Sequence, residues 1–137
     1  MQKITTKDGS STFYNEKYDE TYHSKTGAIE ESEKKFVEPA NIKEGMKILD
    51  VCFGLGYNSA AAIKKTKKLT ITALEMDAEI LKKTKSIEVK GYKREYEKIK
   101  EAAKKLHYKD KEVEINIIMG DATKTIKEID DKFDAVF

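Results

Sequence analysis

The apolar positions along the chain predict strands that alternate with helices. An apolar run at 46–53 leads through a glycine-containing turn into an alanine-rich segment at about 58–66, which predicts a buried strand and a helix. Alternating apolar residues predict further strands at 69–74 and 113–119, and 133–137 predicts a fourth. Other helices are expected at about 28–37, 78–85, 90–106 and 122–129. This order favours an α/β fold with a mainly parallel sheet.

Several residues are predicted to start or stop these helices. Asn58 and Asp77 are suitable N-caps for the helices that follow them, and Pro39 is expected to end the first helix. His107 is interpreted as the residue that closes the helix at 90–106. One apolar stripe along that helix is interpreted as core contact: Tyr92, Tyr96, Ile99, Ala103 and Leu106.

Residues 1–40 are predicted to form an N-terminal cap on a main unit at 41–137. The simplest interpretation is a segment packed by its aromatic residues, and a lid over the glycine turn is the alternative. Its landmarks are a turn signal at Asp8-Gly9, a strand signal at Phe13-Tyr14, a helix-like spacing of Tyr14, Tyr18 and Tyr22, and His23, interpreted as structural.

The turn after the first strand carries the candidate chemistry. Gly54 and Gly56 let a ligand lie against the main chain, and the next helix offers free N–H groups to an anionic group. Acids follow the strands as well: Asp50 near the end of the first, Glu75 after the second and Asp121 after the third. Because ligands of parallel sheets bind beyond the carboxyl ends of strands, we expect one site there.

Two classes of cofactor fit this pattern. A nicotinamide or flavin dinucleotide would bind Gly54-x-Gly56-x-x-Ser59, with Glu75 on its ribose. Asp50 argues against a dinucleotide, because the strand before a dinucleotide-binding turn is usually apolar at this position.

S-adenosylmethionine would bind through its methionine part to Asp50 and the turn, through its ribose hydroxyls to Glu75, and through its adenine to Asp121-Ala122. A Gly-Asp-Ala sequence after the third strand has no part in the dinucleotide fingerprint, whereas a carboxylate can accept the amino group of adenine. The other candidate binding residues flank these positions: Cys52, Phe53, Gly54, Gly56, Asn58 and Met76. We expect no metal site.

Composition gives information on the source and cellular compartment of the protein, but little on its function. Charged residues make up 38% of the chain, against about 25% in a typical domain, and their Lys and Glu enrichment suggests a heat-adapted source. The net charge of +2 neither singles out nor excludes a nucleic-acid partner. A single cysteine, Cys52, excludes an internal disulfide and favours a cytoplasmic protein. No apolar stretch approaches the 18 or so residues of a membrane helix.

Residues 41–56 resemble motif I of class I S-adenosylmethionine-dependent methyltransferases, with Cys52 in place of the usual first glycine. More specifically, the chain resembles the tRNA 5-methylaminomethyl-2-thiouridine methyltransferase domain, which occurs in a bifunctional tRNA-modifying enzyme and in stand-alone relatives. Residues 6–14, 18–32 and 53–58 carry this resemblance, which covers nearly the whole chain.

The resemblance implies a Rossmann-like, doubly wound fold, S-adenosylmethionine as cofactor, and tRNA as substrate. The reaction would be methyl transfer to an aminomethyl group on the wobble uridine. The catalytic acid of the family follows the fourth strand in an Asp-x-Phe-x-Pro-like motif, just after Phe137, so it is not expected within these residues. A non-catalytic module that binds S-adenosylmethionine or a nucleotide, or serves assembly, and an NAD-binding oxidoreductase domain are the alternatives.

The usual strand order of such a fold, three-two-one-four, leaves the sheet incomplete after strand four. The segment 133–137 would then be an unpaired apolar edge, which invites pairing with another chain. We therefore expect a fragment, a separate C-terminal half chain that completes the sheet, or a homodimer that covers the edge.

Overall fold

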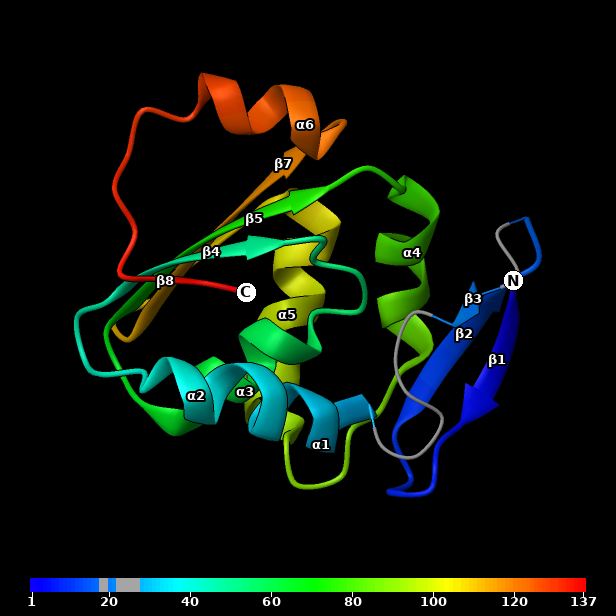
Figure 1. The fold of residues 1–137 in the computed structure, drawn as a ribbon. Coiled ribbons are helices and arrows are strands. Elements are labelled where there is room, and N and C mark those ends of the chain that lie inside the picture. Colours follow the sequence, from blue (N-terminus) through cyan, green and yellow to red (C-terminus); the bar gives the residue numbers. More distant parts are fainter. Residues whose placement is uncertain (18–19, 22–27) are drawn as a thin grey trace.

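A computed structural model describes residues 1–17, 20–21 and 28–137 and shows a central five-stranded sheet (Figure 1). The strand order is β6-β7-β5-β4-β8, in which the last four strands run parallel and β6 runs antiparallel to β7. The strands are β4 (Lys47–Val51), β5 (Leu69–Glu75), β6 (His107–Lys109), β7 (Val113–Met119) and β8 (Ala135–Val136). The predicted α/β class and the three-two-one-four order of the parallel strands are confirmed.

The helices after the parallel strands are close to those predicted. They are α3 (Tyr57–Lys65), α4 (Ala78–Lys83) with a 3₁₀ turn η2 (Thr84–Ser86), α5 (Lys93–Lys105), and α6 (Ala122–Thr125) with a 3₁₀ turn η3 (Ile126–Glu128). Asp77 caps α4 as predicted, because its side chain accepts the Glu79 N–H at 2.9 Å.

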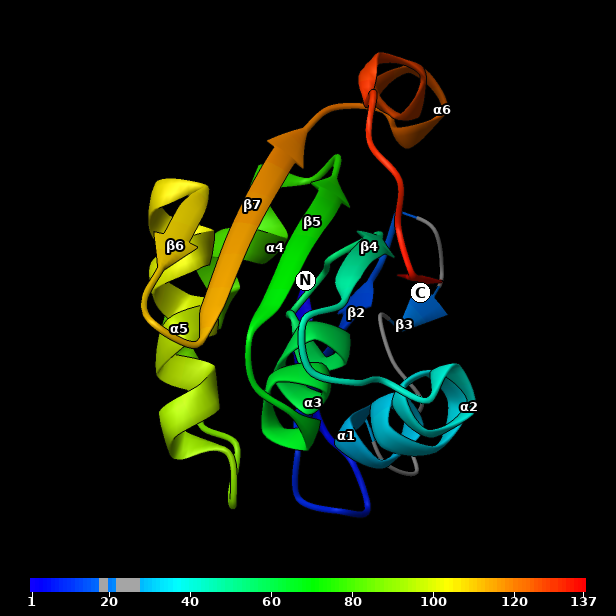
Figure 2. The same ribbon diagram turned by 90° about the vertical axis from the view of Figure 1, so that its left-hand side faces the viewer.

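One face of the sheet packs on helices and holds the core. The alternating residues that this face buries are Leu69, Ile71 and Ala73 of β5 and Val113, Ile115 and Ile117 of β7. Figure 2 shows α5, α3 and the helical segment of residues 28–40 along this face, and α6 on the other side of the sheet. Within the residues that the structure describes, no helix is both long and apolar enough to cross a membrane.

The sequence missed the edge strand β6. His107 does not close a helix: α5 ends at Lys105, Leu106 takes a left-handed conformation with φ 63°, and the chain turns back along β7. The His107 ring nitrogen Nδ1 then lies 2.7 Å from Asn116 Oδ1 across the strand pair. At the opposite edge, β8 is shorter than the predicted strand, and Val136 is 63% exposed there.

The first helical segment continues past the predicted stop at Pro39. It consists of α1 (Ala28–Glu31), a π-helical stretch η1 (Ser32–Val37) and α2 (Glu38–Ala40). Pro39 stands at the start of α2, a position at which the missing N–H of proline is tolerated. The segment ends at Asn41, which is left-handed with φ 51°.

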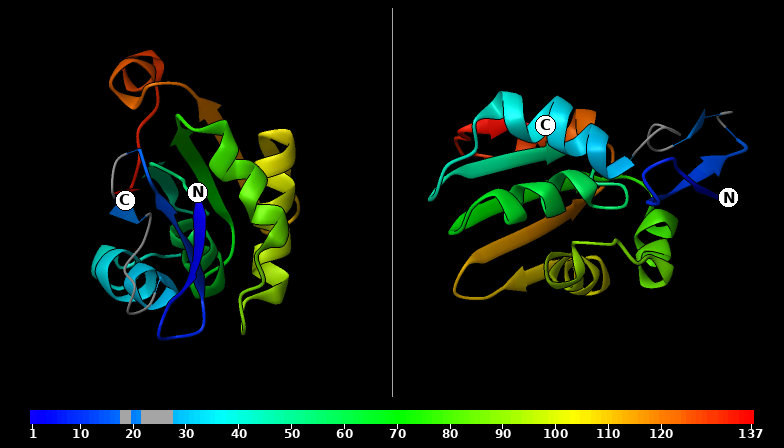
Figure 3. Two further views of the ribbon diagram at one scale, coloured as in Figure 1. Left: turned by 90° about the vertical axis from the view of Figure 1, so that its right-hand side faces the viewer. Right: turned by 90° about the horizontal axis from the view of Figure 1, so that it is seen from below.

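The N-terminus forms a small antiparallel sheet in the order β1-β2-β3, set beside α4 (Figure 3). Its strands are β1 (Gln2–Thr5), β2 (Ser11–Asn15) and β3 (Glu20–Thr21). The turn at Asp8-Gly9 and the strand at Phe13-Tyr14 are confirmed, so Tyr14 lies in a strand and not on a helix face. Tyr18, Tyr22 and His23 lie outside the described residues, and the division at residue 40 stays a prediction.

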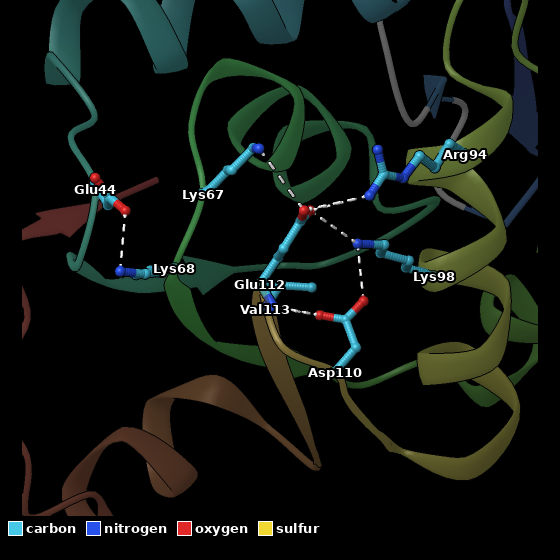
Figure 4. A network of polar contacts seen from close by, with 8 residues as sticks. All are labelled: Glu44, Lys67, Lys68, Arg94, Lys98, Asp110, Glu112 and Val113. Carbon is cyan, nitrogen blue, oxygen red and sulfur yellow. Dashed lines mark hydrogen bonds and ion pairs between the residues drawn. The ribbon is translucent and has the colours of Figure 1, made fainter.

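A network of charges lies at the amino end of β7, opposite the edge that carries the candidate site (Figure 4). Lys98, nearly buried on α5, places its Nζ 2.8 Å from Asp110 Oδ2 and 3.6 Å from Glu112 Oε2. Partial burial opposes ionisation of Asp110, but hydrogen bonds from Lys98 and Tyr108 outweigh it and hold its pKa well below the usual range. The network therefore fixes α5 to the start of β7.

Candidate cofactor-binding site

Three parallel strands bring their carboxyl ends to one rim. Val51 of β4 is level with Leu74, and Glu75 of β5 is level with Met119 of β7. Backbone hydrogen bonds join the connections beyond these ends: the Phe53 N–H donates to the Leu74 carbonyl and the Gly120 N–H to the Glu75 carbonyl, both at 2.9 Å. The glycine turn, Glu75 and the Gly120-Asp121 corner are thus neighbours, as the strand pattern predicted.

The turn itself depends on left-handed backbone. Gly54 has φ 58° and Gly56 has φ 78°, a region that residues with a Cβ rarely adopt. Cys52 is also left-handed at φ 66°, which explains why glycine suits this position better. Gly56 is the N-cap of α3, so the predicted capping role of Asn58 is wrong: the helix starts one residue earlier, at Tyr57.

Glu75 holds the turn from the neighbouring strand, a role that the sequence did not reveal. Its Oε2 accepts the Gly54 N–H at 2.7 Å, and its Oε1 accepts the N–H groups of Met76 and Asp77 at 2.9 and 2.8 Å. A carboxylate has about four lone-pair positions, so these three bonds leave capacity for one further donor. Glu75 is 7% exposed, and that capacity lies at the rim.

Asp50 is fully buried beside the start of α3. Its Oδ2 accepts the Ser59 hydroxyl at 2.7 Å, whereas Oδ1 has no hydrogen-bond partner among the described residues. Burial raises the pKa of Asp50 to about 7; the Ser59 and Asn58 side chains oppose this rise, and the charge of Glu75 adds to it. Asn58 Oδ1 is likewise buried without a partner in the described part of the chain.

The other predicted residues differ in what they can offer. The Cys52 side chain is exposed at the rim, where partial burial together with the charges of Glu75 and Asp50 raises the pKa of its thiol. Met76, which follows Glu75, is 65% exposed. The Phe53 ring is only 2% exposed and belongs to the core, so Phe53 can contribute only backbone groups.

Asp121 lies at the third strand end with an exposed carboxylate. Its Oδ1 accepts the Thr123 hydroxyl at 2.7 Å and the Thr123 N–H at 2.9 Å, so Asp121 caps α6, whose first residue is Ala122. These bonds lower the pKa of Asp121, because they favour the charged form. Among the described residues, the hydrogen bonds of the Asp121 side chain go to Oδ1, so Oδ2 remains available at the rim.

The residues present fit S-adenosylmethionine. Its amino-acid part carries an ammonium group, which suits a buried acceptor that lacks a donor, and Asp50 Oδ1 and Asn58 Oδ1 are two such atoms. Its ribose supplies hydroxyl donors, for which Glu75 has capacity. Its adenine supplies an amino donor, for which Asp121 presents a charged carboxylate. The sequence suggested that a missing side chain at Gly56 leaves room for a ligand, and this is wrong: Gly56 is buried, and a Cβ there would meet Ile99 and Phe53 in the core.

The mostly parallel sheet and its strand order define a class I methyltransferase-like, Rossmann-like fold. Residues 82–137 match the model of a family described as S-adenosyl-L-methionine-dependent methyltransferase. The chain is also 34% identical to MNMC2 from Aquifex aeolicus, whose crystal structure matches 99% of this chain, and 48% of that one, with a TM-score of 0.78. These matches agree with the resemblance inferred from the sequence, and the description of the matching family supports S-adenosylmethionine as the cofactor.

Two further comparisons agree with this result. An uncharacterized protein of Methanocaldococcus jannaschii is 35% identical over 143 residues, which cover 98% of this chain and 40% of that protein. Coclaurine N-methyltransferase, solved with N-methylheliamine and SAH, is 17% identical with a TM-score of 0.51 over 93% of this chain and 30% of that one, and shares the fold. The chain thus spans about half, or less, of the length of these proteins.

Proposed function

We propose that this chain is the cofactor-binding half of a methyltransferase that acts on tRNA, with the aminomethyl group of a wobble uridine as methyl acceptor. The observation that carries the proposal is the rim at which the glycine turn, Glu75 and Asp121 meet beside the buried Asp50. The family resemblance of the sequence supports the substrate, and the similarity to MNMC2 over 99% of the chain supports the family.

Each part of the rim has a distinct task in this proposal. Asp50 and Asn58 hold the amino-acid part of the cofactor with acceptors that have no other donor. Glu75 accepts a hydrogen bond from a ribose hydroxyl and also accepts the Gly54 N–H, which stabilises the turn. Asp121 accepts a hydrogen bond from the amino group of adenine and also caps α6. The rim would therefore bind the cofactor without rearrangement of its own hydrogen bonds.

When bound, S-adenosylmethionine supplies a methyl group on a positively charged sulfur. Transfer to an amine is an in-line displacement, so the main contribution of this half is to fix the position of the donor. The attacking amine must be unprotonated, which requires an acceptor for its proton. We place that acceptor after β8, outside these residues, as the family pattern implies.

The edge strand β8 supports a second, completing half. It pairs with β4 alone in the described structure, through hydrogen bonds from Phe137 N–H to the Leu49 carbonyl at 2.9 Å and from Val51 N–H to the Phe137 carbonyl at 3.2 Å. An apolar edge of this kind tends to pair with another strand. A C-terminal half, or a second copy of the chain, would cover it.

Calorimetry tests the cofactor proposal. S-adenosylhomocysteine should bind the chain, and Glu75→Ala and Asp121→Ala should each weaken the affinity, whereas Asp131→Ala is a matched surface control at the far end of β4. Binding of NADH without S-adenosylhomocysteine would refute the proposal.

Transfer assays then separate an enzyme from a binding module. Methylation of undermethylated tRNA that appears only when the C-terminal half is added supports the split site. The absence of transfer both with and without that half would favour a non-catalytic module.

A further inference from the structure

The glycine turn is held from behind by α5, a helix that supplies none of the predicted binding residues. The Tyr96 hydroxyl on α5 donates to the Leu55 carbonyl at 2.8 Å, and Tyr96 is 2% exposed. Burial raises the pKa of Tyr96 well above its usual value, so the hydroxyl keeps its proton and stays a donor.

This hydrogen bond fixes one end of a planar unit. The peptide group between Leu55 and Gly56 is planar, so its carbonyl and its N–H point in opposite directions. Tyr96 holds the carbonyl end, and the Gly56 N–H donates to the Phe53 carbonyl at 2.9 Å at the other end. With both ends bonded, the plane has no freedom to rotate, and the face of the turn that meets a ligand is set.

The next residue, Gly56, leaves no room for a side chain in the same contact. A Cβ on Gly56 would lie 2.4 Å from Ile99 Cγ2 and 2.9 Å from Phe53 Cζ, so α5 and the turn touch without a gap. The Tyr96 ring also contacts the ring of Tyr57, the first residue of α3, in a tilted arrangement with centroids 5.9 Å apart.

We propose that Tyr96 is a positioning residue for the cofactor: it fixes the Leu55–Gly56 peptide and thereby the surface against which the cofactor lies. This inference rests on the proposed function, and it adds a residue from the core side of the sheet. Tyr96 touches neither cofactor nor substrate. Its effect passes through the backbone of the turn.

The variant Tyr96→Phe removes the hydroxyl and keeps the ring. Tyr92→Phe is the matched control, because Tyr92 is also buried, stands one turn earlier at the start of α5, and donates its hydroxyl to Glu33 away from the turn. Calorimetry with S-adenosylhomocysteine should show a dissociation constant about fivefold weaker for Tyr96→Phe and a change within about twofold for Tyr92→Phe. An unchanged affinity in Tyr96→Phe would overturn the inference, whatever the loss of stability.

Amide hydrogen exchange without ligand separates this inference from the function itself. The Gly56 amide should exchange faster in Tyr96→Phe than in Tyr92→Phe, relative to a core amide such as Ile71. If the unmodified chain binds no S-adenosylhomocysteine, the proposed function fails. Exchange then still decides whether Tyr96 holds the turn, and equal rates in both variants would contradict the inference.

Discussion

Gly56→Ala probes the contact on which the candidate site is built. The residue has a left-handed backbone with φ 78°, and atoms of Ile99 and Phe53 occupy the space that a side chain would need. An alanine there meets Ile99 Cγ2 at 2.4 Å and Phe53 Cζ at 2.9 Å, so the turn and α5 must move apart.

The expected cost has two parts. A left-handed conformation costs a residue with a Cβ about 1–2 kcal/mol. Crowding of a closely packed core adds about 1–3 kcal/mol. Gly56→Ala should therefore lower the free energy of unfolding by about 2–5 kcal/mol.

Gly45→Ala is a control that isolates the first part. Gly45 has φ 86°, but a Cβ there would have no atom within 4 Å. Urea unfolding followed by circular dichroism should show a loss of about 1–2 kcal/mol for Gly45→Ala. Equal losses for the two variants would refute the close packing of α5 against the turn.

Three other changes have defined outcomes. The pKa of Asp50 rises from 3.8 in the unfolded chain to about 7 in the folded one, so the native state holds the proton more tightly. The free energy of unfolding relative to Asp50→Asn should therefore fall by roughly 3 kcal/mol as pH rises from 4 to 7, and parallel pH curves in urea titrations would contradict this. Lys98→Met leaves Asp110 without its 2.8 Å partner and should lower the free energy of unfolding by about 2 kcal/mol. The control Lys105→Met, at an exposed ion pair, should change it by no more than about 0.5 kcal/mol. Equal shifts of the melting temperature in the two variants would contradict a stabilising role of the network. Cys52→Gly relieves a φ of 66° at an exposed residue and should raise the free energy of unfolding by about 0.5–1 kcal/mol, whereas a loss in chemical denaturation would show that Cys52 is unstrained.

The sequence was sufficient for the parallel strands because their apolar residues recur at the period of a half-buried sheet. The strand at Val113–Met119 has the predicted bounds, and the acids that follow the strands meet at one rim. The order of strands followed from the usual order of the fold that the family resemblance implies. Binding by the predicted site residues themselves stays a prediction.

The misses have local causes. The strand at His107–Lys109 is too short to show a period, and it depends on a left-handed Leu106 that no sequence rule requires. Pro39 was expected to stop a helix, but it stands at the start of α2, where proline is tolerated, and the segment ends only at Asn41.

Hydrogen bonds between residues far apart in the chain could not be predicted from the sequence either. The bond from Gly54 to Glu75 and the bond from Tyr96 to Leu55 join residues 21 and 41 positions apart. The apolar stripe correctly placed Tyr96 in the core, but it says nothing of where a buried hydroxyl finds its acceptor. Such pairings become visible only when the packing of helix on turn is known.

The most direct test of this account is a crystal structure of the chain with S-adenosylhomocysteine. The account predicts the amino-acid part beside Asp50 and the glycine turn, the ribose at Glu75 and the adenine at Asp121. A ligand bound away from this rim, with those three carboxylates free, would contradict it.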